Sequence, residues 1–266
     1  MSLKNVKTFL LDMDGTIFLG NKIIDGALAF LEEIKSQGKD FLLLTNNSSK
    51  NRYDYVRKLE DMGIETETDR IFTSGEASVI FLSEAYPSGK VFLLGTKSLE
   101  DEFAAGGFDI VNKRGKAIDY APDFVVLGMD TDLTYEKVWA ACDYISQGIP
   151  FYATHPDINC PIENGKYMPD AGAMIKMFEA STGVSPIIIG KPHEPIVSAV
   201  LKKYRLKKED LAMVGDRLNT DISLGRNAGI ISVLVYSGGT SPEDYADSKI
   251  RADYVFDSVK ELKNHI

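Results

Sequence analysis

Cysteine is scarce in this chain, which has only Cys142 and Cys160 among its 266 residues. Two cysteines are too few for a disulfide framework or a cysteine-rich zinc site, although one isolated disulfide stays open. Long apolar runs are also missing, since no stretch approaches about 18 consecutive apolar residues. The N-terminal segment is apolar only over Phe9–Leu11 before it turns acidic. We therefore expect no signal peptide, no membrane span and a reducing, cytoplasmic location.

The chain also lacks an excess of basic charge. Its 30 Lys and Arg residues stand against 39 Asp and Glu residues, which gives a formal net charge of −9. Such a balance argues against sequence-independent binding of a nucleic acid polymer. The hydrophobic and charged fractions, 44% and 26%, are those of an ordinary folded globular protein. An anionic ligand would therefore need positive charge supplied locally.

Short runs rich in leucine and β-branched residues alternate with longer amphipathic stretches. This pattern predicts an α/β fold with a doubly wound parallel sheet. Turn-rich joints at 86–90 and 181–186 suggest an inserted second domain, and we expect much of the Gly-rich, charged stretch 101–123 to be loop, apart from a short run at 109–111. The predicted strands are 6–11, 41–44, 91–94, 124–127, 149–153, 186–189, 211–214 and 231–235, and the predicted helices are 27–36, 50–62, 76–85, 135–146, 173–180, 196–204 and 222–227.

Two carboxylates stand at the end of the first predicted strand, in the run Asp12-Met13-Asp14-Gly15-Thr16. Open α/β sheets bind ligands at the carboxyl ends of their strands, so both side chains are expected in one crevice. One could act as nucleophile or metal ligand and the other as proton donor. The alternative is an ordinary Asp-rich turn.

The second predicted strand is followed by a cluster of hydroxyl and amide groups, Thr45-Asn46-Asn47-Ser48-Ser49. Such groups bind phosphate oxygens, and a helix that begins near Ser48 or Ser49 would add backbone donors. For the two serines we favour helix capping and turn formation. Thr45 is the candidate phosphate ligand.

Two later strand ends carry further charges. Lys191, within Gly190-Lys191-Pro192, could neutralise a phosphoryl oxygen, although a lone lysine is normally a solvated surface charge. Asp216 and Asp221 bracket a loop after the strand at 211–214 and suit magnesium, which prefers oxygen ligands. The alternative for Asp221 is a favourable charge at a helix N-terminus.

Together these four strand ends resemble the motifs of the haloacid dehalogenase superfamily. The matching residues are DMDGT at 12–16, Thr45, Lys191 and GDRLNTD at 215–221, of which the first and last are the most specific. More narrowly, nearly the whole chain is similar to the NagD and p-nitrophenyl phosphatase subgroup. That subgroup shares TNN at 45–47, ATxPD at 153–157, AGA at 171–173 and GKP at 190–192, whereas His155 stands where relatives often have Asn and Asp170 where many have Gly.

The resemblance implies a magnesium-dependent phosphatase that acts on small phosphate monoesters such as p-nitrophenyl phosphate, nucleoside monophosphates or sugar phosphates. Asp12 would attack phosphorus and form an aspartyl phosphate, and Asp14 would act as general acid and base. Thr45, the Asn46 backbone amide and Lys191 would bind the phosphoryl oxygens.

The same resemblance implies one Mg²⁺ as cofactor. Its ligands would be the Asp12 carboxylate, the Asp14 backbone carbonyl and Asp216, with Asp221 orienting the loop or a metal-bound water. The cation would offset the repulsion between an anionic nucleophile and an anionic substrate.

The resemblance also implies a domain division. Residues 1–81 and 186–266 would form a Rossmann-like core, and residues 82–185 an inserted α/β cap that excludes water and large substrates. Four residues of the predicted cap are candidate leaving-group contacts: His155, Asp157, Asn159 and Asp170.

Other functions stay open at this stage. A response-regulator receiver domain, a phospho-acceptor signalling module, also combines clustered Asp residues with a Thr and a Lys, but this chain is longer and carries Asp14. A dehalogenase in which Asp12 attacks carbon would have no use for Asp14 or for magnesium. The expected partner is a small phosphorylated metabolite, with no nucleic acid and no membrane, and a homodimer is compatible with this interpretation.

Overall fold

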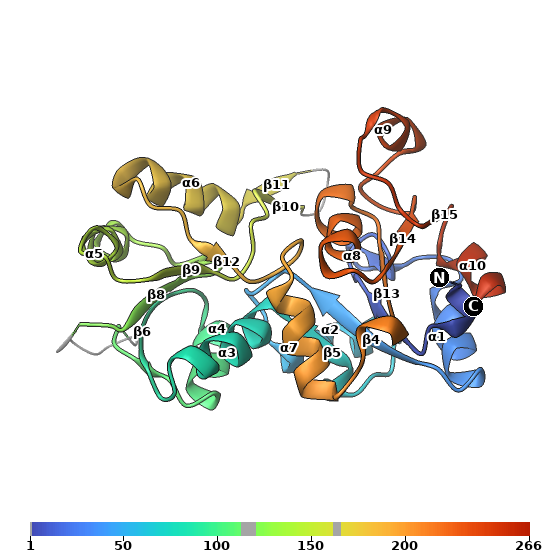
Figure 1. Ribbon diagram of the computed structural model, residues 1–266, viewed down its shortest axis with the longest axis horizontal. Coiled ribbons are helices and arrows are strands. Elements are labelled where there is room, and N and C mark those ends of the chain that lie inside the picture. Colours follow the sequence, from blue (N-terminus) through green and yellow to red (C-terminus); the bar gives the residue numbers. More distant parts are fainter. Residues whose placement is uncertain (1, 113–120, 162–165) are drawn as a thin grey trace. The chain divides into compact units, whose positions relative to one another are not determined.

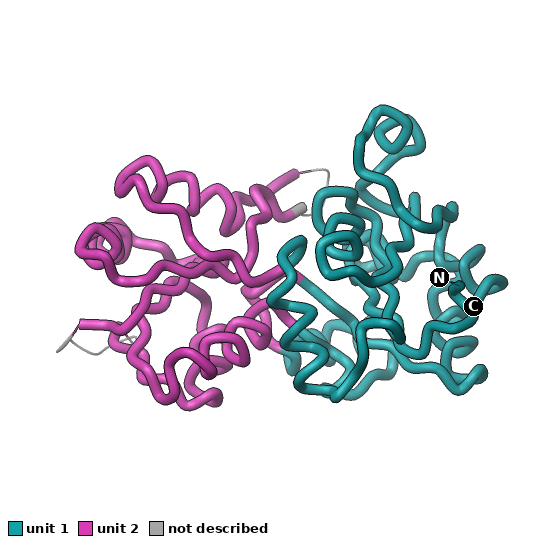
Figure 2. The backbone as a smooth tube through the Cα atoms, viewed as in Figure 1, with its two compact units in different colours: residues 1–45, 52–72, 191–266 teal, residues 46–51, 73–190 magenta. Residues whose placement is uncertain are grey.

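The chain folds into two compact units, which Figure 2 colours separately. The computed structural model describes residues 2–112, 121–161 and 166–266. Unit 1 comprises residues 1–45, 52–72 and 191–266, and unit 2 comprises residues 46–51 and 73–190. The chain therefore leaves unit 1 after Thr45 and finally returns to it at Lys191. The predicted division at residues 82 and 185 stays a prediction; residue 82 lies inside helix α3, Ser74–Ala85.

Unit 1 is built on a six-stranded sheet of order β15-β14-β13-β1-β4-β5 (Figure 1). Its strands are β1 Thr8–Leu11, β4 Asp40–Thr45, β5 Ile71–Thr73, β13 Leu211–Gly215, β14 Ile231–Val235 and β15 Tyr254–Phe256. β1 pairs in parallel with β13 and β4, so that Leu11 lies opposite both Val214 and Leu43. The strand order reverses between β1 and β13, where doubly wound sheets bind ligands at the carboxyl ends. The predicted α/β core is confirmed.

The helices of unit 1 bury apolar faces that are visible in the sequence. In α1, Ala27, Phe30, Leu31 and Ile34 are buried at helical spacing, and the Phe30 ring meets that of Phe9 with centroids 6.1 Å apart. The helices are α1 Ala27–Ser36, α2 Arg52–Asp61, α7 Pro195–Tyr204, α8 Ser223–Ala228, α9 Pro242–Asp247 and α10 Val259–Leu262. Short elements complete the unit: the hairpin β2 Phe18–Leu19 and β3 Lys22–Ile23, 3₁₀ turns at Leu3–Asn5, Thr68–Arg70, Lys208–Asp210 and Lys263–His265, and a π-helical turn at Leu218–Ile222.

Unit 2 contains a second parallel sheet, of order β12-β9-β8-β6-β7. Its strands are β6 Lys90–Leu94, β7 Asp109–Ile110, β8 Phe124–Leu127, β9 Phe151–Ala153 and β12 Ile187–Ile188. β10 Asn159–Pro161 and β11 Tyr167–Pro169 form a separate antiparallel pair. The helices are α3 Ser74–Ala85, α4 Lys97–Ala105, α5 Tyr135–Ser146 and α6 Ala171–Thr182. This unit therefore has its own α/β core.

Two local predictions differ from the structure. The stretch 101–123, much of which was expected to be loop, begins inside a helix, because its residues 101–105 form the second half of α4. Thr96 caps this helix by accepting a hydrogen bond from Leu99 N, and Leu99 and Phe103 are buried. The second helix begins at Arg52 and not near Ser48 or Ser49. The Asn47 side chain accepts a hydrogen bond from Ser49 N at 2.8 Å and so holds the preceding residues in a turn. Residues 113–120 of the expected loop lie outside the described residues.

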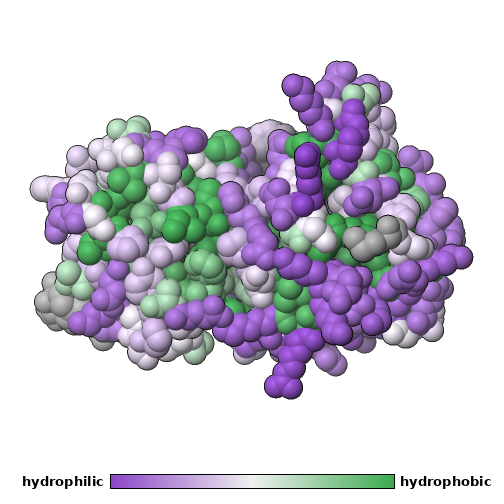
Figure 3. All heavy atoms as spheres, in the orientation of Figure 1, coloured by the Kyte–Doolittle hydropathy of each residue, from purple (hydrophilic) through white to green (hydrophobic). Residues whose placement is uncertain are grey.

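The surface of unit 2 carries most of the large exposed apolar side chains, and Figure 3 shows several hydrophobic patches over this unit. They are Tyr135, Trp139, Ile158, Tyr167, Met177, Val184 and Ile187, against Leu19, Leu28 and Tyr53 in unit 1. Both cysteines are free thiols. Within the described ranges, the helices are too short or too polar to cross a bilayer.

Candidate active site

Asp12 stands immediately beyond β1, and the sheet itself fixes its backbone. Asp12 N donates a hydrogen bond to the carbonyl of Val214 at 2.9 Å, which continues the β1–β13 ladder by one residue. The side chain is 13% exposed and lies 2.5 Å from Lys191 Nζ. Burial raises the pKa of the Asp12 carboxyl well above its ordinary value, while the Lys191 charge opposes this rise. The site therefore offers a carboxylate that is poorly hydrated but still reachable.

Lys191 is a buried cation, and its side chain is only 3% exposed. Its Nζ donates to Asp12 and also to Asp221, at 2.7 Å. Burial alone would lower the pKa of Lys191, but the charges of Asp12 and Asp221 outweigh that effect and hold it above its ordinary value. The surface interpretation of Lys191 is therefore wrong, because the lysine is a buried positive charge between two carboxylates.

Asp216 and Asp221 follow β13 and are both buried. Asp221 lies in the π-helical turn, where its carboxylate accepts a hydrogen bond from Arg217 N at 3.1 Å. Asp216 Oδ2 accepts one from Gly239 N at 2.5 Å. Burial and the neighbouring Asp221 charge raise the pKa of Asp216 to about 6, which the Gly239 amide opposes.

The residues present fit a magnesium ion. Carboxylate oxygen atoms of Asp12, Asp216 and Asp221 lie within 4.8 Å of one another. This is the group of potential metal ligands found in the described part of the chain. Asp216 Oδ1 is buried and has no hydrogen-bond partner among the residues that the structure describes, which is costly unless another group binds it. Clustered carboxylates of this kind bind hard cations such as Mg²⁺. Lys191 donates to both Asp12 and Asp221, whereas Asp216 Oδ1 has no such partner among the described residues, so Asp216 is the direct ligand that this geometry favours most.

Asp14 differs from Asp12 in its surroundings. Its side chain is 49% exposed and lies 3.9 Å from Lys58 Nζ. The next residue, Gly15, has a φ of +91°, and a Cβ there would lie 2.3 Å from Asp216 Oδ2. Only glycine fits this turn, which directs the chain away after Asp12 and leaves Asp14 accessible. An accessible carboxylate can exchange protons with water and with a bound group, as a general acid or base must.

Thr45 and Asn46 occupy the end of β4 and the first position beyond it. Thr45 is the last residue of β4 and is 5% exposed. Asn46 opens the short segment 46–51 of unit 2, and its side-chain amide donates to Asp157 Oδ2 at 2.8 Å. Both residues therefore lie where the chain passes from unit 1 to unit 2.

The four candidate leaving-group contacts all belong to unit 2 but have different surroundings. His155 is fully buried, with Nδ1 2.8 Å from Thr154 Oγ1 and Nε2 2.8 Å from Asp170 Oδ1. Asp170 is 4% exposed and caps α6. Asp157 is partly buried, and Asn159 is exposed in β10. Leaving-group contact stays a prediction for these four residues.

Some residues at the site were missed from the sequence. Ser237 Oγ donates to the Gly15 carbonyl at 2.7 Å, and a Cβ on Gly238 would lie 2.1 Å from Asp216 Oδ2. Together with Gly239, these residues form the turn after β14. Small residues directly after a predicted strand were the available signal, because that strand end lies beside the end of β13. Lys58 comes from α2, and no strand-end rule would find it.

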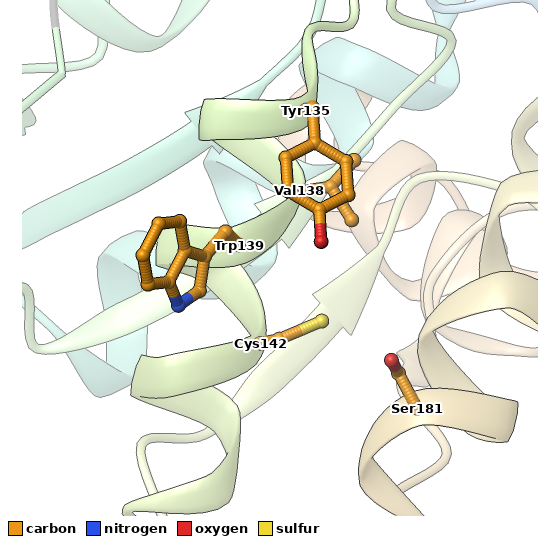
Figure 4. A pocket seen from close by; sticks show the side chains of 5 residues that line it. All are labelled: Tyr135, Val138, Trp139, Cys142 and Ser181. Carbon is orange, nitrogen blue, oxygen red and sulfur yellow. The ribbon is translucent and has the colours of Figure 1, made fainter.

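Unit 2 also contains a pocket whose lining residues differ from the candidate catalytic residues in sequence position and in chemical type. Among the described residues, it is lined by Tyr135, Val138, Trp139 and Cys142 of α5 and by Ser181 of α6 (Figure 4). None of the predicted site residues lines it.

Comparisons with known proteins agree with this geometry. Residues 9–109 match the family model for haloacid dehalogenase-like hydrolases, and residues 188–262 match a second model of HAD-like hydrolases. The acid sugar phosphatase of Staphylococcus saprophyticus is 36% identical over 260 residues, which cover 98% of both chains.

Solved structures give the same result. The 4-nitrophenylphosphatase of Thermotoga maritima is 44% identical, with a TM-score of 0.92 and 98% of each chain covered. The glycerol phosphate phosphatase of Mycobacterium tuberculosis, solved in complex with magnesium, is 26% identical with a TM-score of 0.86 and covers 98% of this chain and 78% of its own. The chain therefore belongs to the haloacid dehalogenase-like hydrolase family, in the NagD and p-nitrophenyl phosphatase subgroup, and is a phosphoric monoester hydrolase.

Proposed function

We propose that this chain is a Mg²⁺-dependent phosphatase that hydrolyses small phosphate monoesters through an aspartyl phosphate on Asp12. The observation that carries this proposal is the cluster at the ends of β1 and β13. There Asp12 lies 2.5 Å from the buried Lys191 Nζ and within 4.8 Å of two further buried carboxylates. A group of carboxylates that can bind a cation lies beside a fixed positive charge. This arrangement suits phosphoryl transfer, which uses both a metal ion and a cationic side chain. Membership in a hydrolase family and the accessible Asp14 favour this function over a receiver-like module.

The reaction divides into two transfers. An Asp12 carboxylate oxygen attacks phosphorus in line, the bond from phosphorus to the leaving oxygen breaks, and Asp14 gives that oxygen a proton. Asp14, now ionised, then takes a proton from a water molecule that attacks the aspartyl phosphate. Inorganic phosphate leaves, and Asp12 and protonated Asp14 are restored.

Fixed donors bind the phosphoryl oxygens during both transfers. Lys191 Nζ, the Thr45 hydroxyl and the Asn46 backbone amide are assigned to this role, because preorganised donors need no reorientation as charge moves. The Asp12 and Asp216 carboxylates and the Asp14 carbonyl would hold Mg²⁺. When bound, the ion offsets the repulsion between the Asp12 carboxylate and the phosphate.

For the substrate, we propose sugar phosphates and other small monoesters, with p-nitrophenyl phosphate as an artificial substrate. The names of the relatives support this class. Unit 2 would act as a cap that selects the leaving group, with Asn159 as the exposed contact among the predicted residues. A panel of phosphorylated metabolites would identify the preferred one. The cytoplasmic location and a homodimer stay predictions, to be checked by cell fractionation and light scattering.

Removing the metal is expected to lower p-nitrophenyl phosphate hydrolysis by about a hundredfold or more, because a dianionic phosphate would otherwise meet three clustered carboxylates. The measurement is steady-state turnover after dialysis against excess EDTA, followed by addition of Mg²⁺. Recovery on addition is expected. Undiminished turnover in EDTA would rule out the metal requirement.

Lys191→Met is expected to lower kcat/KM by about a hundredfold, because it removes the preorganised charge while keeping a side chain of similar volume. The matched control is Lys208→Met, since the Lys208 side chain is 44% exposed and lies 3.1 Å from Glu194. That variant should keep wild-type kinetics. Equal kinetics for both variants would remove Lys191 from phosphate binding.

A further inference from the structure

The Asn46 side chain is hydrogen-bonded within unit 2, although its backbone directly follows Thr45, the proposed phosphate ligand. The side-chain nitrogen of Asn46 donates to Asp157 Oδ2 at 2.8 Å, and the backbone carbonyl of Asn46 accepts a hydrogen bond from the buried Ser74 hydroxyl. Asn46 is 7% exposed, so little water competes for these bonds. A carboxylate–amide hydrogen bond in such surroundings is stronger than one between neutral groups.

Gly190, which precedes Lys191, packs against the same side chain. A Cβ on Gly190 would lie 2.7 Å from Asn46 Oδ1 and 3.2 Å from His155 Cβ. Gly190 N also donates to the Thr154 carbonyl at 2.8 Å. Asn46 and Gly190 therefore contact each other and the same loop of unit 2. Asn46 directly follows Thr45 and Gly190 directly precedes Lys191, the two proposed phosphate ligands.

Asp157 is itself held from the other side by α6. Gly172 N donates to the Asp157 carbonyl at 2.8 Å, and a Cβ on Gly172 would lie 2.1 Å from the Pro156 carbonyl oxygen. The first turn of α6 is thus pressed against the loop, and only a glycine permits this approach. The backbone of Asp157 cannot shift without moving the helix.

A series of buried hydrogen-bonded polar groups also holds the loop that carries Asp157. His155 bridges Thr154 and Asp170, and Asp170 Oδ1 also accepts a hydrogen bond from Ala171 N at 2.6 Å. Thr154 Oγ1 is 3.0 Å from Ser48 Oγ, which accepts a further bond from Met129 N. Each of these groups is buried, so breaking one would leave its neighbour unsatisfied. The loop that carries Asp157 is therefore rigid.

We infer that Asp157 is a positioning residue for phosphoryl binding, and that it acts through Asn46 rather than by touching the leaving group. This inference rests on the proposed function, in which the Asn46 backbone amide binds the phosphoryl group. The Asp157 carboxylate fixes the side chain of Asn46, and this fixes the orientation of the peptide that offers the amide. An amide that is not held must be ordered by the substrate at each turnover, which weakens both ground-state and transition-state binding.

The test is a double-mutant cycle of Asp157→Ala and Asn46→Ala, which keeps the backbone amide of residue 46 in every variant. Each single variant is expected to lower kcat/KM by about tenfold, and the double variant no further, because both remove the same hydrogen bond. The factor should be the same for p-nitrophenyl phosphate and for a sugar phosphate. Inhibition by inorganic phosphate should weaken in parallel. Asp143→Ala, an exposed carboxylate on α5, is the matched control and should leave these values unchanged.

Two outcomes would overturn the inference. Additive losses in the double variant would show that Asp157 and Asn46 act separately, and losses that differ with the leaving group would make Asp157 a substrate contact. Thermal unfolding of each variant distinguishes a folding defect from a loss of phosphoryl binding. A folding defect would reduce the active fraction but leave the inhibition constant for phosphate unaltered. Retained activity of Asp12→Asn would instead contradict the proposed function, so the two failures are distinguishable.

Discussion

Asp12→Asn is expected to lower kcat/KM by on the order of 10⁴ or more, because an amide cannot form the acyl phosphate on which the second transfer depends. The protein should nevertheless remain folded. Burial raises the pKa of Asp12, so keeping it charged at neutral pH opposes folding, and the isosteric amide removes that charge. Lys191 retains Asp221 as a partner at 2.7 Å. In EDTA, the unfolding temperature should equal or exceed that of the wild type.

The opposite behaviour is expected of Asp253→Ala. The Asp253 carboxylate accepts hydrogen bonds from Ser232 N and Ser232 Oγ, both at 2.8 Å, and lies among no catalytic groups. Its loss should cost about 1–3 kcal/mol of stability and leave kcat/KM unaltered. Kinetics and thermal unfolding of the two variants would therefore separate chemistry from folding. Turnover by Asp12→Asn above about one hundredth of wild type would place the nucleophile elsewhere.

The long amphipathic helices could be predicted because the spacing of their apolar residues repeats over several turns in the sequence. The bounds of α1 and α5 are those expected from helical spacing. The three-residue strands β5 and β15 were not predicted, because a period of two cannot be recognised over so short a run. α4 was missed for another reason: its sequence is rich in charged residues, two glycines follow it directly, and its two buried apolar residues, Leu99 and Phe103, are too few to establish a period.

The site could be predicted where the topology alone brings residues together. Parallel strands end at one edge of the sheet, so Asp12 and Asp216 had to lie near each other once the strands were recognised. The Asn46–Asp157 pair had no such rule, since 111 residues separate the two positions and the bond depends on how α6 packs against a loop. His155 illustrates the same limit, because a histidine in a turn-like sequence gives no sign that both of its ring nitrogens are bonded inside a core.

Asp14→Asn is expected to lower steady-state turnover of p-nitrophenyl phosphate by about 10²–10⁴ and to accumulate the phosphorylated enzyme. p-Nitrophenolate is stable as an anion, so Asp12 can still displace it without a proton from residue 14. Water attack on the aspartyl phosphate then lacks its base, and the intermediate persists. Rapid acid quench and intact mass spectrometry should show a phosphate adduct on Asp14→Asn that is absent from Asp12→Asn.

The leaving group provides the decisive contrast for Asp14. A sugar alkoxide needs protonation to depart, so the same variant given a sugar phosphate should be slow in the first transfer and show little adduct. Asp14 is half-exposed and lies near Lys58, and the amide preserves its shape, so this difference would come from the lost proton transfer and not from a collapsed site. Equal adduct from both substrates would show that the first transfer needs no acid. Wild-type turnover by Asp14→Asn, or an adduct on Asp12→Asn, would overturn the assignment of base and nucleophile.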